Sequence, residues 1–311
     1  MGVSDMKKFI LNIFVFFCLV AAIDAFAGLC FGKIQQRAGG RTGAECYACS
    51  ESKEDVIIMG SSRASHHYVP EIISDSLGMT CFNAGQDGNG IILQYGRWKM
   101  ISERYIPKVI IYDVTRGFDL AANDNMAYVD RLKPFCGDDQ VREYVAGIFP
   151  MERLKLFSKM YRYNYKFIEM LSDCRVDNGN ALKGYIPLYG QIRQEMVEKA
   201  AAMPNEIKAV DYDETKLKYI EQLAKECQEA GTKLFFVVSP YYGGGGCDRD
   251  SFRPVIEIAV RYGVPFYYYN ETDLIGRPEL FKDSSHLNDE GAREFTKTLM
   301  SQIRIWVLPQ R

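Results

Sequence analysis

The chain has 311 residues, of which 47% are hydrophobic, and 38 Lys and Arg residues nearly balance 40 Asp and Glu residues, for a formal net charge of −2. This length allows one large domain or two small ones, and the composition suits a packed core. A nearly neutral chain lacks the basic surface that nucleic-acid binding requires, so we exclude a nucleic-acid partner.

The N-terminus carries a long apolar segment. Lys7 and Lys8 precede a mostly apolar stretch that ends near residue 31 and contains one carboxylate, Asp24. Its length suits a membrane anchor, and the two lysines predict that the chain beyond it is exported. Small residues at 25–28 would also suit signal-peptide cleavage, which would leave a secreted protein. We therefore assign residues 1–31 to a membrane anchor or signal segment.

Five short runs rich in apolar, β-branched and aromatic residues predict buried strands. They cover residues 55–60, 80–85, 108–114, 233–240 and 264–270. Helical patterns separate most of them, for example the segment that begins at Pro70 and stops at Gly78, and a longer one that stops at Gly231. Alternating strands and helices predict an α/β fold over residues 54–311, a three-layer α/β/α sandwich around a parallel sheet of about five strands.

Two stretches depart from this alternation. Residues 32–53 are rich in Gly, Arg, Ser and Glu without a hydrophobic period, so we interpret them as a linker. The stretch from about 117 to 210 contains no convincing strand and is interpreted as a helical insertion. Within it, apolar residues at spacings of four and three predict one helix with a core-facing side. These residues are Leu156, Met160, Tyr163, Phe167 and Met170.

Polar residues follow each predicted strand at the edge where parallel sheets bind ligands. The turn after the first strand contains Ser62, and the loop before the last predicted helix, at about 289–305, contains Asp283 and His286. Histidine can accept the serine proton while the aspartate orients its ring, so these three residues are the candidate catalytic set. The alternative is a helix-capping loop with incidental polar residues. The glycine run at 243–246 is interpreted as a flexible rim loop.

The other two histidines, His66 and His67, are too close along the chain to Ser62 to reach its hydroxyl easily. We expect them to line the rim or to contact substrate. The candidate substrate-binding residues are Arg63, His66, His67, Asp87 and Asn89.

The turn GSS after the first strand, Gly88 after the second and DxxH before the last helix together resemble the SGNH hydrolase superfamily, the GDSL-like esterases. The resemblance covers about residues 55–300 except for the insertion. It implies a flavodoxin-like sandwich and a reaction that needs no metal or organic cofactor. It also implies that Ser62 is the nucleophile, with Ser61 in place of the usual Asp and as the second candidate.

The same resemblance implies an oxyanion hole made by the backbone N–H groups of Ser62 and Gly88. The family's third donor is an Asn after the third strand, where this chain has Thr115 and Arg116. Arg116 is the candidate replacement. Loss of one such donor typically lowers the rate by about 100- to 1000-fold.

An N-terminal anchor, GSS in place of GDS and the missing Asn are together similar to exported SGNH-like proteins that help to O-acylate cell-surface polysaccharides. This likeness implies an exported serine esterase or O-acyltransferase. Its substrate would be an acylated, in particular O-acetylated, carbohydrate or small ester, and a membrane-bound acyltransferase is a further partner to expect. The alternative is a non-catalytic protein that binds glycan or assists an acylation complex.

Overall fold

The structure is a computed structural model that describes residues 3–176, 183–202, 210–243 and 248–308. Most of the glycine run at 243–246 therefore lies outside the described residues. The chain divides into two compact units, which we call the anchor unit and the sheet unit. The anchor unit consists of Met1–Cys46 and Val129–Asn178, and the sheet unit of Tyr47–Tyr128 and Gly179–Arg311.

The sheet unit is built on five parallel strands in the order β2-β1-β3-β4-β5. The strands are β1 (Val56–Gly60), β2 (Cys81–Asn83), β3 (Val109–Asp113), β4 (Lys233–Val238) and β5 (Phe266–Tyr268). All five lie within the predicted runs, and β1 and β3 are completely buried, as the continuous apolar character of their sequences indicates. The order is that of flavodoxin-like sheets, so the predicted fold class is confirmed.

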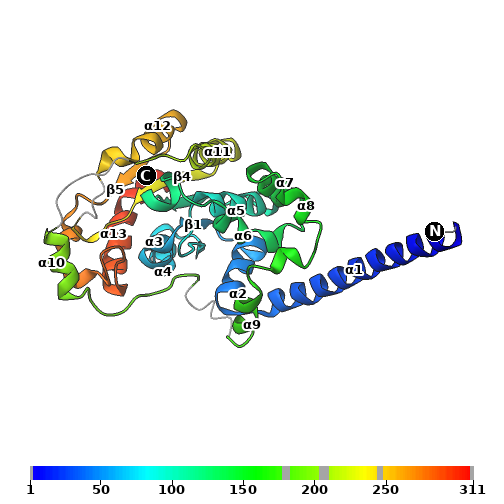
Figure 1. Cartoon of the computed structure of the whole chain (residues 1–311). Coiled ribbons are helices and arrows are strands. Elements are labelled where there is room, and N and C mark those ends of the chain that lie inside the picture. The colour runs from blue at the N-terminus through cyan, green and yellow to red at the C-terminus, as the bar shows by residue number, and fades with distance from the viewer. Residues whose placement is uncertain (1–2, 177–182, 203–209, 244–247, 309–311) are drawn as a thin grey trace. The chain divides into compact units, whose positions relative to one another are not determined.

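Helices cover both faces of the sheet (Figure 1). On one face α13 packs on α3 and α4, and on the other α11 packs on α5 and α12. These helices are α3 (Ser62–His67), α4 (Pro70–Leu77), α5 (Ile91–Arg104), α11 (Glu214–Ala230), α12 (Arg253–Tyr262) and α13 (Asp289–Val307). Glycines in the left-handed conformation end α4 at Gly78 and α11 at Gly231, as predicted.

Shorter elements complete the sheet unit. They are η1 (Tyr47–Glu51), η2 (Arg116–Leu120), α10 (Gln194–Ala202), η7 (Arg249–Phe252), η8 (Asp273–Gly276) and η9 (Pro278–Leu280). The core on the α13 side joins strand residues such as Ile58 and Ile111 to Ile73 of α4 and to Phe295 and Leu299 of α13. This packing holds α3 and the loop before α13 on the same side of the sheet.

The anchor unit begins with α1 (Val3–Arg37), a helix long and apolar enough to cross a membrane. Its most apolar window has a mean hydropathy of 2.5 and is only 6% buried within the structure. A span needs about 20 such residues, so α1 exceeds the required length. Further elements of this unit are α2 (Gly40–Cys46), η3 (Lys133–Phe135), α7 (Asp139–Ile148), α8 (Glu152–Lys155), η4 (Tyr161–Tyr163) and α9 (Phe167–Asp173), and α6 (Met126–Asp130) lies at the boundary.

Residues 32–53, predicted to be a linker, are mostly helical: they contain the end of α1, all of α2 and η1. The interior contact that orders α2 is charged instead of apolar. Glu45 is buried, accepts a hydrogen bond from Arg131 at 2.9 Å and forms an ion pair with Lys166. Hydrophobic periodicity does not reveal such a helix, because the contacts that hold it are between charged side chains.

The single helix predicted around Leu156 to Met170 is also wrong, because the structure divides this segment into α8, η4 and α9. The break follows from the side chain of Asp24, which accepts hydrogen bonds from the backbone N–H groups of Lys159 and Met160. These N–H groups are thereby diverted from continuous helical bonding. Leu156 and Met170 remain buried, as predicted, whereas Met160 is 47% exposed.

Candidate active site

The candidate nucleophile lies at the crevice between β1 and β3, where the strand order changes direction and flavodoxin-like sheets bind ligands. Ser62 is the first residue of α3, two residues beyond the end of β1. Gly60 has a φ of 138°, and a Cβ there would lie 2.6 Å from the carbonyl oxygen of Asp113. Glycine is therefore required in the turn that presents Ser62 at the sheet edge.

Three predicted residues form one continuous chain of hydrogen bonds. The Oγ of Ser62 lies 2.8 Å from Nε2 of His286, and Nδ1 of His286 lies 3.0 Å from each carboxylate oxygen of Asp283. Because Nδ1 faces a carboxylate, we assign the ring proton to Nδ1. The lone pair on Nε2 is then directed at the serine hydroxyl.

The Asp283 carboxylate is held by its own loop. Its Oδ1 accepts the backbone N–H groups of Ser285 at 2.8 Å and His286 at 2.9 Å. Burial raises the pKa of Asp283, but its hydrogen bond and electrostatic interaction with His286, together with these backbone bonds, outweigh burial and leave the pKa lowered. Asp283 is therefore ionised at neutral pH and can stabilise a proton on the ring of His286.

Arg63 is buried in the protein and does not contact the open rim, in contrast to its expected substrate contact. Its guanidinium donates to the carbonyl oxygens of Ser239 at 2.6 Å and Val114 at 2.8 Å, and lies 3.1 Å from the carboxylate of Asp113. The ring of Tyr241 lies 4.0 Å from its central carbon. Arg63 thus ties the start of α3 to the ends of β3 and β4.

His67 is fully buried, and both ring nitrogens have partners. The backbone N–H of Leu287 donates to Nε2 at 3.0 Å, so Nδ1 carries the proton toward Ser239 Oγ, 2.9 Å away. Burial, together with the charge of Arg63, keeps the pKa of His67 well below its usual value. Because Leu287 follows His286, neutral His67 fixes the histidine loop against α3, and this positioning differs from the rim role expected for it.

The other expected substrate-contacting residues lie beside the site and are mostly buried. Nδ1 of His66 is 2.7 Å from the carbonyl oxygen of Ile186, Nε2 is 3.3 Å from Asp87, and the ring meets that of His286 edge-on with centroids 5.5 Å apart. Asn89 is buried and donates to the carbonyl of Asp87 at 2.8 Å. Only Asp87 of these three keeps a substantially accessible side chain, at 27%.

The backbone N–H groups expected to hold an oxyanion are those of Ser62 and Gly88. Ser62 opens α3, and N–H groups in the first turn of a helix have no partner within that helix. Gly88 is exposed in the loop after β2 and has a φ of 69°. Asn83, one of the polar residues after the second predicted strand but with no predicted role, orders this loop: it accepts from the Gly85 N–H and donates to the carbonyls of Ala64 and Tyr68. The signal for this role in the sequence is an Asn at the end of an apolar strand.

After β3, where the family has its third oxyanion donor, this chain has Thr115 and Arg116 in place of an Asn. The hydroxyls of Thr115 and Ser61 lie 2.7 Å apart, and the Thr115 N–H donates to the buried carboxylate of Asp119 at 2.6 Å. Hydrogen bonds from Ser251 lower the pKa of Asp248, and the positive charge of Arg116 acts in the same direction. The charge of Arg116 is thus felt at Asp248, just before η7, and its role as an oxyanion donor stays a prediction.

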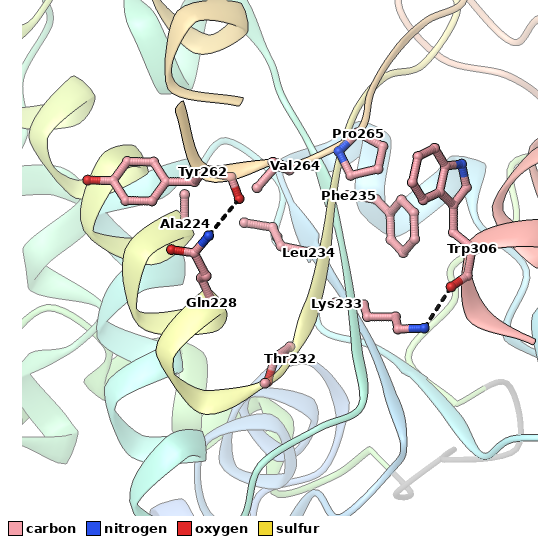
Figure 2. Close-up of a pocket in the computed structure, with 12 residues that line it drawn as sticks. Ala224, Gln228, Thr232, Lys233, Leu234, Phe235, Tyr262, Val264, Pro265 and Trp306 are labelled. Atoms are coloured by element: carbon pink, nitrogen blue, oxygen red, sulfur yellow. Dashed lines mark hydrogen bonds between the residues drawn. The ribbon is translucent and has the colours of Figure 1, made fainter. Parts of the chain in front are cut away.

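A separate pocket of about 400 Å³ lies at the opposite end of the sheet, beside the starts of β4 and β5 (Figure 2). Two of its polar side chains are bonded to the backbone: Gln228 donates to the carbonyl of Tyr262 at 3.2 Å, and Lys233 to that of Trp306 at 2.7 Å. Its lining contains neither His nor Cys nor an acidic residue. This pocket therefore lacks the combination of serine, histidine and carboxylate that meets at Ser62.

No protein-family model matches the sequence, and neither does any curated protein. Among solved structures, the chain is similar to the crystal structure of an acetyl xylan esterase, AlAXEase, with a TM-score of 0.39 and 12% sequence identity. The alignment covers 80% of this chain and 99% of that chain. At this score and identity, the likeness carries no argument about activity or substrate.

Proposed function

We propose that the protein is a serine esterase or O-acyltransferase that acts on acyl groups of a carbohydrate. The observation that carries this proposal is the continuous hydrogen-bonded chain from Ser62 through His286 to Asp283. A serine, a general base and an orienting carboxylate in this order are the arrangement that activates a hydroxyl for attack on an acyl carbon.

In the first half of the reaction, Ser62 Oγ attacks the ester carbonyl while Nε2 of His286 takes the hydroxyl proton. Negative charge develops on the carbonyl oxygen, where the N–H groups of Ser62 and Gly88 stabilise it. The carboxylate of Asp283 holds the Nδ1–H and stabilises the imidazolium. His286 then returns its proton to the departing sugar oxygen, which leaves an acyl group on Ser62.

In the second half, a water molecule or a second hydroxyl group attacks the acyl-enzyme, and His286 accepts its proton. The bond between the acyl carbon and Ser62 Oγ then breaks, and His286 returns the proton to Ser62. Water makes the protein an esterase, and a sugar hydroxyl makes it an acyltransferase. The carbohydrate substrate and the O-acetyl group rest on the resemblance to exported SGNH-like proteins. The same resemblance and the apolar α1 support an exported location, with α1 retained as an anchor or, alternatively, removed from a secreted protein.

A non-catalytic role in glycan binding or in an acylation complex is the second candidate. The observation that favours it is the third donor position, where the Thr115 hydroxyl lies against Ser61 and the Thr115 N–H is bonded to Asp119. A site with two backbone donors can still support catalysis. One missing donor costs about 100- to 1000-fold, which is less than the contribution of a complete triad.

Labelling by a fluorophosphonate and release of nitrophenol from nitrophenyl acetate distinguish the two candidates. We expect the wild-type chain to be labelled and active, and Ser62→Ala to lose labelling and about 10,000-fold or more in rate. Ser61→Ala is the matched control, because it removes the neighbouring hydroxyl and should retain labelling. An unlabelled wild type would support the non-catalytic protein instead, whereas equal labelling of Ser62→Ala would move the nucleophile to another residue, with Ser61 as the second candidate.

A further inference from the structure

The second half of α1 is a packed part of the anchor unit. The Asp24 side chain accepts three hydrogen bonds from the insertion: from the hydroxyl of Ser158 at 2.5 Å and from the N–H groups of Lys159 at 2.8 Å and Met160 at 3.1 Å. A carboxylate inside an apolar helix is costly in a membrane, and these donors satisfy it. The insertion therefore supplies the partners that α1 lacks.

The contact continues along α1 toward its C-terminal end. The ring of Phe31 lies between two aromatic rings of the insertion, with centroids 5.7 Å from Tyr163 and 5.0 Å from Phe167. Gly32 lets the Tyr163 hydroxyl approach, since a Cβ at this glycine would lie 3.3 Å from it. A signal segment destined for removal has no need of such specific packing, so these contacts favour an α1 that stays in the folded protein.

The insertion also exposes an unusual number of apolar side chains. Among the described residues outside α1, the densest group of exposed large hydrophobic residues lies between 151 and 176. We call this group the apolar collar. It consists of Met151, Leu154, Phe157, Met160, Tyr165, Phe167, Ile168, Leu171 and Val176. Phe157 and Ile168 are 77% and 81% exposed, and a group of exposed apolar side chains, unlike a single one, marks an interaction surface.

The position of the collar along α1 indicates what covers it. A bilayer core takes about 20 residues of helix, so a span that starts after Lys8 ends shortly beyond Asp24. Phe157 precedes Ser158, which is bonded to Asp24, and thus lies at the depth where the hydrocarbon core ends. Basic side chains occur on α1, at Lys33, and on the insertion, at Lys159 and Arg162. They suit the phosphate layer just beyond the hydrocarbon core.

We infer that the apolar collar is a membrane-seated surface, which lies in the outer interface of a phospholipid bilayer beside α1. Its apolar side chains enter the boundary between headgroups and acyl chains, as in interfacial amphipathic segments. The side of the membrane follows from the proposed export, but the bilayer contact itself does not depend on the proposed enzyme activity. The insertion therefore braces the anchor at the membrane surface.

Depth-dependent quenching of tryptophan fluorescence tests this inference on the full-length chain. Variants Phe157→Trp and Ile168→Trp are reconstituted into vesicles of phosphatidylcholine and phosphatidylglycerol with brominated acyl chains. Val260→Trp is the matched control, because Val260 is 79% exposed on α12 of the sheet unit. Phe14→Trp, within the span, reports insertion of α1. Native Trp98 and Trp306 contribute the same background to every variant.

We expect both collar variants and Phe14→Trp to lose most of their added emission in brominated vesicles, and Val260→Trp to lose none. If Phe14→Trp is quenched and the collar variants are not, the inference is overturned and the collar faces a protein partner. If Phe14→Trp is not quenched either, α1 does not insert and the inference also fails. Fluorophosphonate labelling in the same vesicles reports separately on the proposed function.

Discussion

Two hydrogen-bonded groups in the sheet unit contain the same residue types, yet only one is arranged for acyl transfer. In the open group, His286 lies between Ser62 and Asp283, with side chains 23% exposed at His286 and 36% at Asp283. In the buried group, Ser239 lies between His67 and Asp113, and none of the three is accessible.

The order of the residues and their burial decide what each group can do. The open histidine has a free lone pair directed at a hydroxyl that substrate can reach, whereas the lone pair of His67 is used by the backbone N–H of Leu287. Burial raises the pKa of Asp113, although the Arg63 charge counteracts it, and the ion pair with Arg63 at 3.1 Å makes the buried group a structural support. Its function is to hold α3 and the histidine loop together, and the following three variants test this division.

The largest expected effect is the loss of rate in Asp283→Asn. The amide would donate to Nδ1 of His286 and force the proton onto Nε2, which can then no longer accept from Ser62. Such a tautomer exchange lowers the rate by about 10,000-fold, or roughly 5 kcal/mol. Ser239→Ala, in the buried group, should retain fluorophosphonate labelling. Equal rates for Asp283→Asn and wild type would remove Asp283 from the mechanism.

A smaller effect, on stability, is expected for Arg63→Met. It leaves the buried carboxylate of Asp113 without its cation, which typically costs about 3–5 kcal/mol of unfolding free energy. The control is Arg261→Met, which breaks an exposed ion pair with Glu221 worth under about 1 kcal/mol. Both native tryptophans lie in the sheet unit, so their emission during urea unfolding follows that unit. Equal midpoints for the two variants would contradict the supporting role of Arg63.

The smallest effect is a pH dependence. The folded pKa of His67 is lowered, so the unfolded chain binds a proton below about pH 6.5 that the folded chain does not bind. This contribution to stability is complete above the unfolded pKa and is lost as the pH falls, by about 1.4 kcal/mol per pH unit. His67→Asn should flatten the fall between pH 6.5 and 5, measured by urea unfolding. Ser239→Ala leaves the histidine in place and should keep the slope.

The strands and the residues at their ends were predictable because local patterns encode them. Buried parallel strands are continuous apolar runs, and ligand groups follow their carboxyl ends whatever the details of packing. Ser62 and His286 were paired on this basis, although 224 residues separate them. The glycine stops of α4 and α11 were equally local.

The insertion was predicted less well, because its structure depends on contacts with distant residues. Asp24 interrupts the expected helix by accepting N–H groups of Lys159 and Met160, and Glu45 orders the expected linker through Arg131 and Lys166. No periodic pattern within either segment reveals a partner that lies about one hundred residues or more away in the chain.

The sequence by itself determined the parallel sheet, the apolar first helix and the residue types that gather at the β1–β3 edge. Only the tertiary structure decided that His67 becomes a buried support instead of a rim residue. His67 and His286 are the same side chain, but α13 packs over α3 and buries one ring while the DxxH loop leaves the other open. Burial and hydrogen-bond partners, which set the proton on each ring, are properties of the packed chain.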